Sequence, residues 1–72
     1  MKTRYYIYTV ITTKEQTEEL VNHLKMNGYD FLINGYLSDG LSLGVNEDET
    51  DYVETIMEDR DIDYRMVDYE WL

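Results

Sequence analysis

The 72-residue sequence predicts a single α+β domain, spanning residues 1–72, with a four-stranded antiparallel sheet and two helices. Two observations predict this class. Four segments are rich in β-branched and aromatic residues or alternate between apolar and polar side chains, as strands do. Two further segments carry apolar residues at helical spacing behind capping or acidic residues, as amphipathic helices do.

The first strand is predicted at residues 4–12, where almost every side chain is β-branched or aromatic. Both alternating faces are largely apolar, which is typical of a central strand. We expect Ile7 and Ile11 to face the helices. Tyr6 and Tyr8 then lie on the opposite, open face of the sheet. The reverse choice, which would bury both tyrosines in the core, stays open.

A capping box predicts where the first helix begins. Thr12 and Glu15 have the required spacing, and Thr13 and Gln16 offer the same spacing one residue later. The pair Asn27-Gly28 supplies a left-handed stop. The apolar stripe that this helix buries is expected to consist of Leu20, Val21 and Leu24.

A hairpin is predicted in the middle of the chain. Residues 30–37 form its first strand, and Ser38-Asp39-Gly40 gives the turn signal. Residues 41–45 alternate between aliphatic and small side chains, so they form the third strand, antiparallel to the second. The hairpin residues that we expect to face the helices are Phe31, Ile33, Leu41, Leu43 and Val45.

The acidic stretch 46–51 suits a helix N-terminus, where carboxylates meet the positive end of the helix dipole. Residues 59–63 interrupt this helix, and residues 64–72 form the last strand. The buried stripe of the second helix is expected to consist of Val53, Ile56 and Met57. The order β-α-β-β-α-β resembles the ferredoxin-like fold, with both helices on one face of the sheet. Because that fold hosts enzymes, RNA binders, sensors and inhibitors, it does not indicate a function.

The sequence carries a formal net charge of −10, and the charge is uneven. Residues 46–72 hold eleven acidic and two basic residues, so they account for −9 of the total. Direct binding to DNA, RNA or an anionic membrane is not expected, because those ligands require Lys and Arg to neutralise phosphate. The chain has no cysteine, no apolar run long enough to span a membrane and no recognisable signal peptide, so we expect a cytoplasmic location.

The acidic residues of the second helix form a pattern. Four of them, spaced at i, i+4, i+7 and i+11 from Glu47 to Glu58, lie along one edge of the helix. Such a surface can copy the charge of nucleic acid and occupy a basic cleft on a nucleic-acid-binding protein. The alternative is a solvated acidic face without a partner. The predicted partner-binding residues are Glu47, Asp48, Asp51, Glu54, Glu58, Asp59, Asp61 and Asp63.

The open face of the sheet is a second candidate surface, predicted to be rich in tyrosine. Base stacking there is disfavoured, because the third strand offers only Ser42 and Gly44 and the surroundings are negative. Tyrosine and methionine are favoured at protein interfaces, which predicts a homodimer or a partner contact through this face. The predicted interface residues are Tyr6, Tyr8, Tyr36, Tyr64 and Met66.

Catalysis is not expected. His23 is the only histidine, and without cysteine the chain offers no Ser-His or Cys-His arrangement. Residues 59–65 carry acids at the spacing of a calcium loop, but Tyr64 stands where such a loop needs glycine. We therefore expect no enzyme activity, no cofactor and no metal site.

The leading hypothesis is a decoy that presents the acidic helix to a basic, nucleic-acid-binding surface. The chain resembles the anti-restriction and anti-CRISPR proteins of bacteriophages in its small size, its negative charge and its acidic stripe. This resemblance implies that the chain is an inhibitor. A small-ligand regulatory domain of the amino-acid-sensor type is an alternative, with the Asn34-Gly35 and Asp39-Gly40 turns as its only pocket candidates. A structural subunit that dimerises through the tyrosine-rich sheet face is another.

Overall fold

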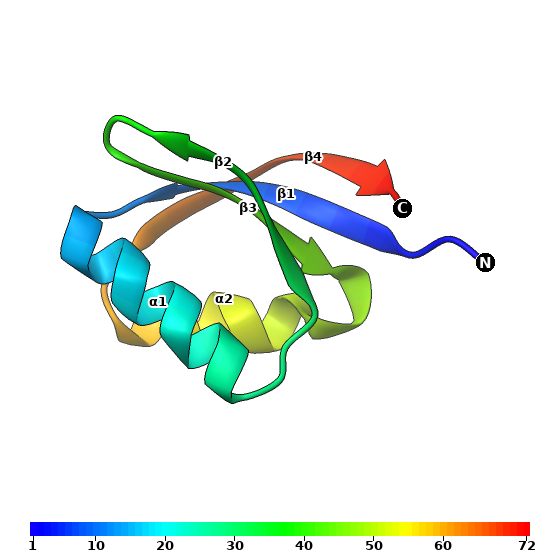
Figure 1. Ribbon diagram of the computed structural model, residues 1–72, viewed down its shortest axis with the longest axis horizontal. Coiled ribbons are helices and arrows are strands. Elements are labelled where there is room, and N and C mark those ends of the chain that lie inside the picture. Colours follow the sequence, from blue (N-terminus) through cyan, green and yellow to red (C-terminus); the bar gives the residue numbers. More distant parts are fainter.

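The structure, a computed structural model, describes all of residues 1–72. Its elements are β1 (Arg4–Ile11), α1 (Lys14–Met26), β2 (Phe31–Leu37), β3 (Gly40–Asn46), the 3-10 turn η1 (Glu47–Glu49), α2 (Thr50–Asp59) and β4 (Asp63–Trp71). The strands lie in the order β2-β3-β1-β4, and every neighbouring pair is antiparallel. Both helices cover the same face of the sheet (Figure 1). The predicted ferredoxin-like fold is thus confirmed.

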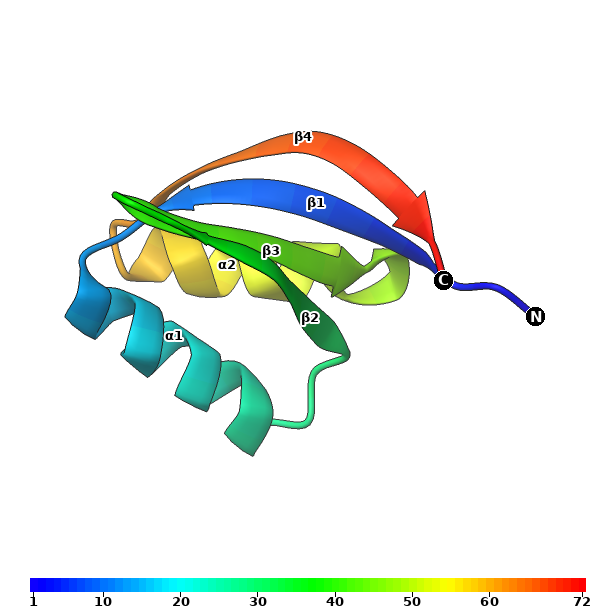
Figure 2. The same cartoon turned by 45° about the horizontal axis from the view of Figure 1, so that its top comes forward.

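The predicted helix signals lie where they were expected. Thr13 is the N-cap of α1: its side chain accepts a hydrogen bond from the Gln16 backbone N–H, and the Gln16 side chain accepts one from the Thr13 backbone N–H. At the other end, Gly28 adopts φ 71°, the left-handed conformation that favours glycine. The two helices run in opposite directions beneath the sheet (Figure 2). Neither is long and apolar enough to cross a membrane.

The β2–β3 hairpin brings β3 close to β1. Gly40, the first residue of β3, lies so near β1 that a Cβ atom there would sit 1.9 Å from the Val10 carbonyl oxygen. The sequence therefore needs glycine at this position because of a backbone contact as well as the turn. The alternating β3 residues Leu41, Leu43 and Val45 are fully buried against the helices, as predicted.

A single core lies between the sheet and the helices. Leu20 and Leu24 of α1 and Val53 and Met57 of α2 point into it, which confirms most of both predicted stripes. The ten buried residues of the core are Tyr8, Val10, Leu20, Leu24, Leu41, Leu43, Val45, Val53, Met57 and Ile62.

The predicted orientation of β1 is wrong. Tyr8 and Val10 are fully buried on the helix side of the sheet. The register explains this result, because Tyr8 lies opposite Leu43 and Val10 lies opposite Leu41. Directly paired residues point to the same face, so the clear alternation of β3 fixes the face of β1, which its own composition leaves ambiguous.

The open face of the sheet consequently has different residues from those predicted. Ile7 points to it yet is only 4% exposed. Leu32 covers it by reaching across Gly44, where a Cβ atom would lie 2.6 Å from Leu32 Cδ1 and 3.3 Å from Ile7 Cδ1. The open face thus carries a small aliphatic contact in place of a broad aromatic patch.

The tyrosines predicted for the open face belong to the helix side. Tyr64 and Met66 of β4 pair with Val10 and Tyr8, and Tyr36 of β2 pairs with Leu41. Tyr6 likewise packs against the core. The prediction of a tyrosine-rich open face, formed by Tyr6, Tyr8, Tyr36, Tyr64 and Met66, is therefore wrong.

Candidate binding surface

The predicted acidic residues occupy η1, α2 and the turn that leads into β4. Asp51 and Asp59 lie on the exposed side of α2, near its start and at its last residue. Asp61, in the turn after the helix, has φ 55°, a left-handed conformation that aspartate tolerates. We call the exposed aspartates of this region the acidic surface: Asp48, Asp51, Asp59, Asp61 and Asp63.

The end of α2 is unfavourable for negative charge. Its last turn contains no basic residue, although the helix dipole favours cations there. Asp59 occupies this turn and makes no side-chain hydrogen bond or ion pair, so its carboxylate does not contribute to stability through a partner. By contrast, acidic residues at the start of α2, such as Asp51, suit the positive end of the dipole.

Glu54 and Glu58 of the predicted stripe turn toward the sheet. The hydroxyl of buried Tyr8 donates a hydrogen bond to Glu54 Oε2. The hydroxyl of Tyr64 donates one to Glu58 Oε2, and its ring packs edge-on against Tyr8, with ring centroids 5.8 Å apart. The long glutamate side chains thus link α2 to β1 and β4.

These contacts perturb the two tyrosines. Burial raises the pKa of Tyr8 far above its usual value, and the hydrogen bond to the Glu54 carboxylate raises it further. For Tyr64 the hydrogen bond to Glu58 is the largest cause, and together with desolvation it raises the pKa to about 12. Both hydroxyls therefore remain protonated donors well above neutral pH.

Glu47 of η1 also has an internal partner. Arg4 Nη2 lies 2.9 Å from Glu47 Oε2, and Arg4 Nε donates to the same oxygen at 3.0 Å. The Arg4 guanidinium carbon lies 4.9 Å from the Tyr6 ring centroid, 5.6 Å from Tyr69 and 5.3 Å from Trp71. The sequence alone did not predict this contact of Arg4 with the aromatic rings, because the pairing of β1 with β4 brings together residues from the two ends of the chain.

Few positive charges neutralise the acidic surface. The chain contains two ion pairs, Arg4–Glu47 and a longer contact of 3.8 Å between Arg60 and Glu19. Neither involves an aspartate of the acidic surface. These aspartates therefore have no ion-pair partner inside the chain.

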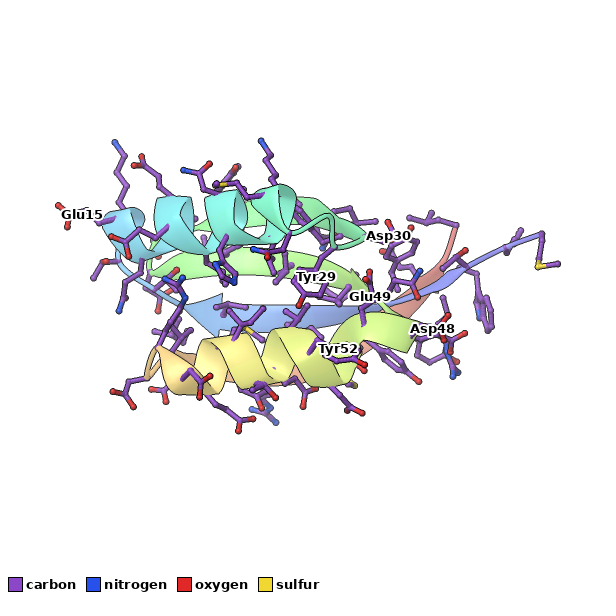
Figure 3. All side chains as sticks on the ribbon, turned by 90° about the horizontal axis from the view of Figure 1, so that it is seen from below. Glu15, Tyr29, Asp30, Asp48, Glu49 and Tyr52 are labelled. Atoms are coloured by element: carbon purple, nitrogen blue, oxygen red, sulfur yellow. The ribbon has the colours of Figure 1, made fainter.

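A second polar group holds the start of the acidic segment in place. The Tyr5 hydroxyl donates to both Asp30 carboxylate oxygens at 2.8 and 2.9 Å, and Asn46 Nδ2 donates to Asp30 Oδ2 at 2.9 Å. The Asp30 backbone N–H donates to Glu49 Oε1 at 2.6 Å. Figure 3 shows Tyr29, Asp30 and Glu49 gathered where α1 ends and α2 begins. The Asp30 hydrogen bond raises the pKa of Tyr5.

A hollow of about 620 Å³ opens between α1 and the β2–β3 hairpin. Its lining includes Ser38 and Gly40, which flank the Asp39 of the predicted turn, but neither Asn34 nor Gly35. The charged side chains beside it are Lys14 and Glu18. No group of three or more Asp, Glu or His side chains is arranged to hold a metal ion, and His23 is half-buried on α1.

Comparison with protein-family models, with curated proteins and with solved structures finds no match to this chain.

Proposed function

We propose that this chain is a small acidic binding protein that acts as a decoy, with its acidic surface occupying a basic site on a nucleic-acid-binding protein. The observation that carries the proposal is the set of exposed, unpartnered aspartates along and beyond α2. Asp59 is the most informative of them, because it lies where the helix dipole favours a cation. A lysine or arginine of a partner would pair with the Asp59 carboxylate, which has no partner inside the chain.

The net charge supports the same proposal. A charge of −10 on 72 residues repels nucleic acid and attracts proteins with a basic face. Complementary charge raises the association rate, and the attraction weakens as salt screens it over a Debye length of about 8 Å at physiological ionic strength. The likeness in size and charge to phage anti-restriction and anti-CRISPR proteins favours an inhibitor that acts inside a bacterial cell. The proposed activity is binding alone and requires no cofactor.

The test is capture of proteins from a bacterial lysate on the immobilised chain, followed by a salt gradient and by competition with double-stranded DNA. The structure determines which residues should be changed. Glu54 and Glu58 are unsuitable, because they accept tyrosine hydrogen bonds and their loss would change the fold as well as the charge. Asp51→Asn with Asp59→Asn removes two carboxylates that make no side-chain bond.

The matched control is Glu15→Gln with Asp39→Asn. These two residues are exposed, lie outside the acidic surface, and their replacement also changes the net charge from −10 to −8. We expect a nucleic-acid-binding protein to be retained, to be displaced by DNA, and to leave the Asp51/Asp59 variant at lower salt than the control. Equal elution from both variants, or retention that DNA does not affect, would contradict the proposal.

A further inference from the structure

The end of β4 extends beyond the cover of α2. The helix has 10 residues and the strand has 9, which correspond to lengths of roughly 15 Å and 30 Å at the usual rises per residue. β1 and β4 continue past the helix toward the chain termini (Figure 2). On the helix side of this uncovered part lie Tyr69 and Trp71, which are 52% and 51% exposed.

These rings already hold a guanidinium group. Arg4 lies within 6 Å of the centroids of Tyr6, Tyr69 and Trp71 and pairs with the Glu47 carboxylate. A planar guanidinium stacks on aromatic faces and bonds to a carboxylate, whereas the ammonium of lysine is a more strongly hydrated point charge. The internal contact therefore shows that the rings accommodate a guanidinium. We call Tyr6, Tyr69 and Trp71 the aromatic cluster.

Arg4 leaves about half of the Tyr69 and Trp71 surface uncovered. A second copy of this chain is a poor occupant, because two chains that each carry a net charge of −10 repel one another. Exposed aromatic rings on a chain with a net charge of −10 are instead complementary to a partner that brings both positive charge and a flat side chain. Arginine meets both requirements.

We propose that the aromatic cluster binds arginine side chains of the basic partner, at the end of the acidic surface where Asp48 follows Glu47. This inference rests on the proposed function and deepens it: the partner's basic site is rich in arginine, and stacking on Tyr69 and Trp71 discriminates arginine from lysine. Because stacking depends less on long-range charge than the acidic surface does, the preference for arginine persists as salt is raised.

The test measures, by calorimetry, the affinity of the purified chain for two peptide probes of equal length, oligoarginine and oligolysine. Trp71 is the only tryptophan, so its fluorescence reports binding at the cluster directly. We expect oligoarginine to bind about 2- to 5-fold more tightly per stacked contact than oligolysine, and to change the Trp71 emission.

The variants Trp71→Leu and Tyr69→Leu each remove one ring and keep an apolar side chain. Both sites are half exposed, so the fold should persist, which circular dichroism checks. We expect each variant to lose most of the arginine preference and to keep its affinity for oligolysine. Tyr52→Leu on α2, an exposed tyrosine that takes no part in the Arg4 contact, is the control and should keep the preference.

Equal affinity for the two peptides in the unaltered chain would overturn this inference. A preference that survives in both ring variants would do the same. In either case salt-dependent binding of both peptides would leave the decoy proposal standing. Failure of both peptides to bind at low salt would overturn the two proposals together.

Discussion

Replacing Tyr8 by Phe tests the corrected orientation of β1. In the structure, the Tyr8 ring is fully buried and its hydroxyl donates to Glu54. The substitution keeps the ring, so no cavity forms, and it removes only the hydroxyl. Glu54 is then left with the hydroxyl of Tyr64 at 3.5 Å, the outer limit for a hydrogen bond.

The expected loss of stability follows from these contacts. A hydrogen bond to a charged group contributes about 1.5–3 kcal/mol, and a half-buried carboxylate that loses its donor falls in that range. A chain of this length has a free energy of unfolding of roughly 4–11 kcal/mol at about 0.05–0.15 kcal/mol per residue. The loss is therefore a large fraction of the total, and Tm should fall by about 4–8 °C for each kcal/mol.

Urea unfolding followed by circular dichroism measures this change. The control is Tyr36→Phe, because Tyr36 is 72% exposed and its hydroxyl makes no hydrogen bond. Combining Tyr8→Phe with Glu54→Met, which removes the acceptor and keeps the length of the side chain, in a double-mutant cycle should give a coupling energy of about 1 kcal/mol or more. A difference of less than about 0.5 kcal/mol between Tyr8→Phe and Tyr36→Phe, the usual scatter of surface substitutions, would show that the Tyr8 hydroxyl is not a buried donor to Glu54.

Three further substitutions test other parts of the structure. Gly40→Ala places a Cβ atom 1.9 Å from the backbone of β1, so it should cost about 3 kcal/mol or prevent folding; Gly35→Ala, which meets nothing within 4 Å, should be nearly neutral in the same thermal melts. The hydrogen bond to Glu58 raises the pKa of Tyr64 from its ordinary 10.0 to about 12 in the folded chain. The contribution of the protonated Tyr64 hydroxyl to the free energy of unfolding is therefore fully present below pH 10 and is lost as the pH rises through 12. Tyrosinate absorbance and the alkaline unfolding midpoint should therefore change in Tyr64→Phe, and an identical midpoint would contradict this cause. Asp59→Lys should raise stability by roughly 0.3–1 kcal/mol through the helix dipole while weakening partner capture; a loss of stability would show that Asp59 has a structural role.

The sequence was sufficient for the elements but not for the face that β1 turns to the core. The alternation of Leu41 and Leu43 and the Thr13 capping box are local signals, so the positions of strands and helices could be predicted. The face of β1 is decided by its pairing with β3, and both sets of its side chains are apolar enough to be buried. The Tyr8–Glu54 hydrogen bond joins residues 46 positions apart, and no local pattern indicates it.

The acidic segment separates into two kinds of carboxylate. Between residues 47 and 63 every glutamate receives a hydrogen bond or ion pair from another part of the chain: Glu47 from Arg4, Glu49 from the backbone of Asp30, Glu54 from Tyr8 and Glu58 from Tyr64. None of the aspartates in the same stretch has a side-chain partner. The longer glutamate side chain can reach back to the sheet, whereas the shorter aspartate stays close to the helix surface. The glutamates therefore tie this segment to the rest of the fold, and the aspartates are left without a partner inside the chain. The predicted stripe at i, i+4, i+7 and i+11 combined glutamates and aspartates. Spacing along a helix identifies the residues that share one edge, but it does not show whether each side chain turns toward the sheet or toward solvent.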